Sequence, residues 1–150
     1  MKFWIEIFDK EDTDVVVDSY ERYGSANIHQ NNEMKPGDVV FIYSKSEGRV
    51  LYRTYVSRLN SFVAENGTPF VDTYLKEPMI ISESLTLDSL KKLGLDESAL
   101  KENVANPMDN GEVIARLQLV FDNEDDYSTP NAHQEKMRII FTARDNCREQ

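Results

Sequence analysis

The side chains best suited to binding chemistry lie in one polar segment, residues 25–32. It contains Ser25, Asn27 and His29 and has few apolar residues. Hydroxyl, amide and imidazole groups donate and accept hydrogen bonds, which the recognition of a polar ligand requires. Binding residues concentrate on loops that a rigid scaffold holds, so this segment is interpreted as a ligand-facing loop. The alternative interpretation is an ordinary loop with Asx-type turns.

Residue patterns typical of catalysis are missing from the sequence. His29 and His133 are far apart, and neither has a second histidine at the spacing of a metal site. The sequence contains neither a glycine-rich phosphate loop nor a Gly-x-Ser-x-Gly motif. The acidic run at 122–126 lacks the spacing of a calcium loop, and the single cysteine, Cys147, lies in a polar tail. Missing motifs do not exclude an enzyme, but they favour a binding module, and no metal or cofactor is expected.

The charge of the chain restricts its partners. The 150 residues carry a formal net charge of -10, which opposes broad binding to a phosphate backbone. A pocket for a single base, or a surface for a basic protein, is compatible with this charge. A local basic face would lie around the central hairpin, where five basic residues are clustered: Lys35, Lys45, Arg49, Arg53 and Arg58.

The elements that would position the polar segment are mainly strands. Residues 2–8 alternate, with Ile5 and Ile7 on one face and Trp4 on the less apolar face, which predicts a strand with one buried face. Trp4 either packs under a neighbouring element or lines a cavity. Residues 35–38, Lys-Pro-Gly-Asp, are typical of a tight turn.

A central hairpin follows this turn. The β-branched and aromatic run at 39–44 predicts a buried strand, and residues 49–59 predict its partner. We expect Val39, Phe41 and Leu51 in the core. Residues 70–81 are expected to be mostly extended.

Helices are predicted around the sheet. A helix over 15–23 would be capped within 12–14 and end at Gly24, and another would follow a Thr86 cap and end at Gly94. Asp96 would cap a short helix over 97–104, broken at Asn106-Pro107. Residues 111–121 favour helix at their start and strand at their end, and residues 136–142 predict a final strand.

In this arrangement the chain resembles the EVE family of the PUA-like superfamily, small mostly β barrels related in fold to the YTH and ASCH domains. The resemblance covers roughly residues 2–121 and is carried by Phe3-Trp4-Ile5, by Gly24-Ser25-Ala26-Asn27 and, most tightly, by residues 34–44. Two features depart from the family. Ile7-Phe8-Asp9-Lys10 replaces its Lys-Ser-Glu-Pro segment, and Trp4 is the only tryptophan.

The resemblance implies an α+β fold, a PUA-like twisted β-barrel with short helices packed on it, over residues 1–143, with a polar tail at 144–150. It further implies a non-catalytic module that binds a DNA or RNA base, with a modified base as the first expectation. The base would stack on Trp4 or Tyr43 and be held by Asn27 with Ser25 and His29. The alternatives are an acidic protein-interaction domain, a small-molecule sensor and, third, an ASCH-like hydrolase.

The sequence also predicts the setting of the protein. No apolar run approaches the roughly 20 residues that span a bilayer, and the N-terminus alternates as a strand does, unlike a signal peptide. We therefore expect a cytoplasmic protein without membrane association. The lack of a long apolar helical seam predicts a monomer or a weak dimer.

Overall fold

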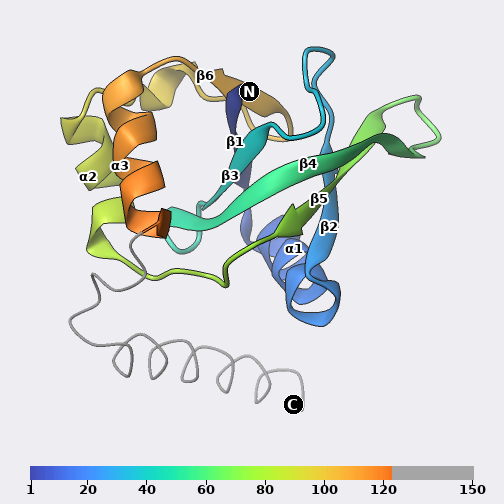
Figure 1. Ribbon diagram of the computed structural model, residues 1–150, viewed down its shortest axis with the longest axis horizontal. Helices are drawn as coiled ribbons and strands as arrows, with labels where there is room; N and C mark the ends of the chain where they lie inside the picture. Colours follow the sequence, from blue (N-terminus) through green and yellow to red (C-terminus); the bar gives the residue numbers. More distant parts are fainter. Residues whose placement is uncertain (123–150) are drawn as a thin grey trace.

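A computed structural model describes residues 1–122 as a curled six-stranded sheet with helices on both sides (Figure 1). The strand order is β2-β5-β4-β3-β1-β6. This α+β half-barrel confirms the predicted fold class. The predicted strand at 136–142, the polar tail, His133 and Cys147 lie outside the described residues. Within residues 1–122, no helix is long and apolar enough to cross a membrane.

Parallel pairing of β1 (Phe3–Phe8) with β3 (Val39–Ser44) forms the centre of the sheet. The turn before β3 is confirmed, with Gly37 at φ +92°, a backbone conformation that glycine adopts without strain. Antiparallel neighbours extend the sheet in both directions: β4 (Arg49–Val63), β5 (Pro69–Leu75), β2 (Ser25–His29) and β6 (Ala105–Met108). The hairpin is confirmed, and β4 extends beyond the predicted end at residue 59.

Apolar clusters cover both faces of the central strands. Val39, Phe41 and Leu51 are at most 1% exposed, as predicted. The prediction that β1 buries only one face is wrong, because Trp4 and Glu6 are fully buried as well. β1 lies between β3 and β6, and α1 (Lys10–Tyr23) covers the face that Trp4 and Glu6 occupy.

The two longer predicted helices differ in how well their caps were predicted. The predicted cap within 12–14 is wrong, because the Asp9 carboxylate caps α1 by accepting from the Asp12 N–H at 2.8 Å. The helix therefore begins earlier than predicted, and it ends at Gly24 as predicted. Thr86 caps α2 (Leu87–Lys92) as predicted. A short 3₁₀ turn, η1 (Glu83–Leu85), precedes α2.

Three predicted elements are wrong. Residues 97–104 form only the 3₁₀ turn η2 (Glu97–Ala99), because the chain then extends as β6 along the edge of β1. β6 contains Pro107, which an edge strand tolerates. The predicted strand at the end of 111–121 is helical, because α3 (Gly111–Asp122) buries Val113, Leu117 and Phe121 on one continuous face. Residues 25–29 form β2 instead of a loop, because Ala26 and Ile28 alternate into the core and the backbone pairs with β5.

Candidate ligand-binding site

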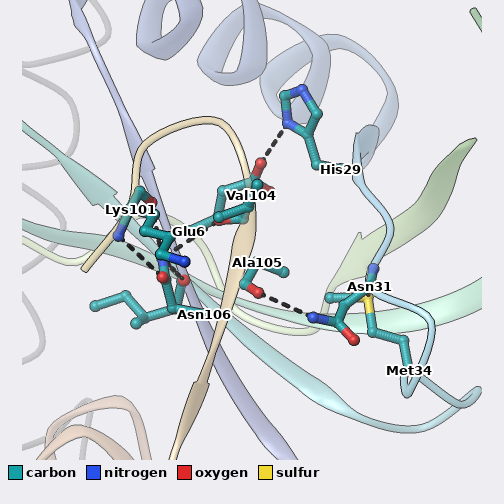
Figure 2. A network of polar contacts seen from close by, with 9 residues as sticks. Glu6, His29, Asn31, Met34, Lys101, Val104, Ala105 and Asn106 are labelled. Carbon is teal, nitrogen blue, oxygen red and sulfur yellow. Dashed lines mark hydrogen bonds and ion pairs between the residues drawn. The ribbon is translucent and has the colours of Figure 1, made fainter. Parts of the chain in front are cut away.

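The candidate site lies where the two edge strands of the curled sheet approach each other (Figure 2). Asn31, just after β2, donates its side-chain N–H to the carbonyl of Ala105 in β6 at 3.4 Å. Close by, His29 of β2 reaches Glu6 of β1. These two side chains therefore join the β2 edge of the sheet to β6 and to its neighbour β1. We call the region formed by Glu6, His29, Asn31 and Ala105 the seam.

Buried Asn106 holds the β6 side of the seam in place. Its side-chain amide donates to the carbonyl oxygens of Ile5 at 3.2 Å, Lys101 at 2.9 Å and Val104 at 3.3 Å. Its carbonyl oxygen accepts from the Lys101 N–H at 3.0 Å. This one amide thus holds residues 101–104, which lead into β6, next to β1 on this side of the seam.

Glu6 and His29 form a buried acid–imidazole pair at the seam. His29 Nδ1 lies 2.5 Å from Glu6 Oε1, and the side chain of Glu6 has no exposed surface. Glu6 Oε2 has no hydrogen-bond partner within residues 1–122. A buried polar atom without a partner is rare, because its desolvation is not compensated.

The environment alters the pKa of both groups. Burial raises the pKa of Glu6, against the opposing effect of the hydrogen bond from His29. The hydrogen bond to Glu6 raises the pKa of His29, against the effect of burial. The pair therefore retains protons to higher pH than the same side chains do in water.

A cavity of about 160 Å³ opens beside this pair. Its wall combines Asp12 and Val15 of α1, Asn27 and His29 of β2, and Phe70 of β5. An apolar protein cavity of about 150 Å³ can hold benzene, so the space suits a single planar ring. The lining supplies apolar contact together with carboxylate, amide and imidazole groups that can bind ring substituents.

Two of the five predicted ligand residues meet at this cavity. Asn27 and His29 line it, and the side-chain oxygen of Asn27 accepts from Ser61 Oγ at 2.6 Å. Ser25 lies on the same strand outside the cavity lining, and its carbonyl accepts from Ser19 Oγ at 2.7 Å. Alternation along β2 explains why Asn27 and His29 point the same way.

The expectation that Trp4 and Tyr43 line one cavity is wrong. Trp4 has no exposed surface, packs in the cluster under α1 and donates its indole N–H to Asp38 Oδ2 at 3.1 Å. Tyr43 is 7% exposed and packs in the cluster on the opposite face of the sheet. In this structure neither ring offers an open face, because each strand is covered on both sides.

Glu6, Asp12, Val15 and Phe70 were not predicted as site residues. A signal for Glu6 was present, because Glu6 shares one face of the first strand with Trp4 and Phe8. A carboxylate between two large aromatic residues at alternate positions suggests a buried acid. Phe70 and Asp12 carry no local signal, because only the pairing of β5 with β2 and the placement of α1 bring them to the cavity.

Acidic side chains pair with most of the basic residues that cluster around the hairpin. Lys45 pairs with Glu102, and Arg49 lies 3.6 Å from Glu83. The buried Arg53 contacts Glu77 at 2.5 Å and Asp122 at 2.6 Å. Three of the five clustered cations are thus partly neutralised by acids. Within the described part of the chain, no group of three or more His, Cys, Asp or Glu side chains is placed to hold a metal ion.

Comparison with known proteins places the fold. No family model and no curated protein matches this sequence. A protein from Leishmania major described as hypothetical superposes with a TM-score of 0.58 at 15% identity, over 83% of this chain and 97% of that one. ASCH from Zymomonas mobilis gives 0.52 at 13% identity, over 79% and 95%. The Mmi1 YTH domain, in a complex with RNA, gives 0.53 at 9% identity, over 82% and 81%.

At these identities the likeness concerns the fold alone. ASCH and YTH domains share the curled sheet seen here, whereas no finding distinguishes the EVE family among domains of this shape. The chain therefore has a PUA-like α+β fold, similar to that of the ASCH and YTH domains.

Proposed function

We propose that this protein is a non-catalytic module that binds one nucleic-acid base in the cavity beside the Glu6–His29 pair. The observation that carries the proposal is the cavity itself, which combines ring-sized space, an apolar wall and the imidazole of His29, whose Nδ1 is held by the buried Glu6. The fold adds support, because the Mmi1 YTH domain of the same fold is in a complex with RNA.

The lining suits the two parts of a base. Val15 and Phe70 offer apolar and aromatic contact to the ring. The Asn27 amide can donate and accept, the Asp12 carboxylate accepts, and His29 uses Nδ1 for Glu6, which leaves Nε2 for a ligand. Such groups match the donors and acceptors on the edge of an unpaired base.

The apolar wall gives a reason to expect a modified base. Burial of one methyl-sized group contributes about 0.8 kcal/mol. Since about 1.4 kcal/mol corresponds to a tenfold change in affinity, a methyl group against Val15 would improve binding about fourfold. The acidic chain would add few phosphate contacts, so affinity would depend little on salt.

Calorimetric titration with a defined panel tests the proposal. The panel contains the standard nucleosides, methylated adenosine and cytidine, and RNA tetranucleotides of each base. We expect at least one member to bind, and Phe70→Ala to weaken it about fivefold to 150-fold, because stacking on an aromatic ring contributes about 1–3 kcal/mol per base. Asn27→Ala should weaken it about two- to tenfold, as expected for one hydrogen bond.

Ser25→Ala is the matched control, because Ser25 lies on the same strand outside the cavity lining. The Ser25→Ala variant should bind each member of the panel with the same affinity as the wild type does. The proposal is wrong if no member of the panel binds, or if Ser25→Ala weakens binding as much as Asn27→Ala does. Nucleosides that bind as tightly as tetranucleotides would favour a small-molecule sensor.

A basic protein partner is a second candidate, which the outer face of α1 favours. Glu11 and Asp14 are exposed there, in a helix whose first turn is acidic. Glu11→Lys combined with Asp14→Lys should abolish binding to lysine-rich and arginine-rich peptides while nucleoside binding stays unchanged. Peptide binding that survives this double change would exclude the α1 face as the interface.

A further inference from the structure

Three aromatic rings form a row across neighbouring strands beside the cavity. Phe62 of β4 pairs with Phe70 of β5, and Phe70 pairs with His29 of β2. The ring centroids of Phe62 and Phe70 are 5.5 Å apart, and those of Phe70 and His29 are 4.8 Å apart. Phe62 is 54% exposed, so the row begins at the cavity and ends on the open surface.

An irregularity in β4 places Phe62 in this row. The pairing with β5 passes from Arg58↔Asp72 to Phe62↔Phe70, so β4 bulges between these points. Within the bulge, Asn60 has a φ of +54°. Bulges redirect side chains and are frequent beside functional sites, and a non-glycine residue at positive φ is maintained only where its surroundings hold it.

Gln30, which directly follows β2, holds the bulge from the other side of β5. Its side-chain carbonyl accepts from the Asn60 N–H at 2.7 Å, and its amide donates to Asn60 Oδ1 at 3.2 Å. This pair of hydrogen bonds spans from the end of β2 to β4. It therefore fixes Phe62 relative to His29, the residue that lines the cavity.

Two pairs of neutral side chains border the row. Gln30 hydrogen-bonds with Asn60, and Ser61 Oγ donates to Asn27. A charged partner of the row is Glu6, which pairs with His29. Phe70 belongs to both the cavity lining and the row. An apolar ring surface with amide groups at its margin, continuous with a cavity for a ring, fits the face of a second base better than it fits a phosphate.

We propose that the row binds the base of a nucleotide adjacent to the one in the cavity, so that the ligand is a single strand of at least two nucleotides. This inference rests on the proposed function. Paired bases present only their edges, whereas stacking on Phe62 requires an exposed face. Stacking of this kind tolerates many sequences, since every base has a π-face.

Binding of nucleosides and RNA tetranucleotides to the whole chain separates the two proposals. The wild type should bind the best tetranucleotide at least tenfold more tightly than the corresponding nucleoside. Phe62→Ala should weaken tetranucleotide binding about fivefold to 150-fold, the range for one stacked base, and leave nucleoside binding unchanged. Val63→Ala is the matched control, because Val63 is 53% exposed on the same strand and lies outside the row.

A further variant tests the role of the bulge. Gln30→Ala should lower tetranucleotide affinity without changing nucleoside affinity, whereas Asn60→Gly should preserve both, because glycine accepts positive φ and keeps the backbone N–H that donates to Gln30 over the shorter of the two hydrogen bonds. Unchanged tetranucleotide affinity in Phe62→Ala would overturn the inference and leave the cavity proposal intact. Tetranucleotide binding that depends on Phe62, with no nucleoside binding and no effect of Asn27→Ala, would support the row and refute the cavity. Absence of all binding would refute both.

Discussion

Removal of the imidazole from the Glu6–His29 pair should destabilise the protein in a pH-dependent way. The Glu6 carboxylate has no exposed surface, and in His29→Ala its Oε1 loses the imidazole while its Oε2 has no partner within residues 1–122. Removing one partner of a buried ion pair typically destabilises by about 3–5 kcal/mol. His29 itself is 24% exposed, so water can enter the space that it leaves, and we expect the lower end, about 3 kcal/mol.

This loss should be visible in both denaturant and thermal unfolding. For a chain of this size, 1 kcal/mol shifts the melting temperature by about 2–4 °C. The melting temperature of His29→Ala should therefore fall by about 6–12 °C at pH 8. Below pH 6.5, where the proton on His29 contributes fully, the fall should become smaller toward pH 5, because burial raises the pKa of Glu6 and a protonated Glu6 no longer leaves an unpaired charge in the core.

A double-mutant cycle isolates the interaction. Glu6→Gln keeps an oxygen that can accept from His29 and removes the charge, so we expect it to change stability by less than about 1 kcal/mol. In the E6Q background, His29→Ala should lose only the value of one neutral hydrogen bond, about 1 kcal/mol. The reasoning is refuted if His29→Ala destabilises by less than 1 kcal/mol at pH 8, or equally with and without E6Q.

Three further predictions follow from the packing and charges. Phe41→Ala should destabilise by about 3–5 kcal/mol in a urea melt, because Phe41 has no exposed surface, and a change below 1 kcal/mol would contradict its burial. The hydrogen bond to Glu6 raises the pKa of His29 above 6.5, so the stabilisation from its proton is complete below pH 6.5 and is lost as the pH rises through the folded-state pKa. The unfolding free energy relative to His29→Gln should fall as the pH rises above 6.5, and a flat difference from pH 6.5 to 9 would contradict the shift. Random duplex DNA should bind weakly at physiological salt, because Lys45, Arg49 and Arg53 are already paired with acids. Tight binding with a steep salt dependence in an electrophoretic titration would contradict this prediction and reveal a basic face.

Features set by neighbouring residues were predictable from the sequence. The turn at Gly37, the caps at Thr86 and Asp96 and the helix end at Gly24 depend on side chains and backbone within a few positions. The same holds for the extended conformation of the first strand and the buried run of the hairpin, two of the features on which the family resemblance, and with it the correct fold class, was based. Local chemistry decides these features, so they remain visible without knowledge of the rest of the chain.

Tertiary structure decided which of these elements are covered, and by what. The extended path of β6 depends on the free edge of β1, about a hundred positions away in the chain. Trp4 is buried because α1 and β6 cover a face that its own pattern marks as only partly apolar, and Asp38 satisfies its indole N–H. Glu6 and His29 meet only when the sheet curls and brings its two edges together. Alternation indicates which residues share a face of a strand, but burial and pairing depend on what packs against that face, and those contacts are made by residues distant in the chain.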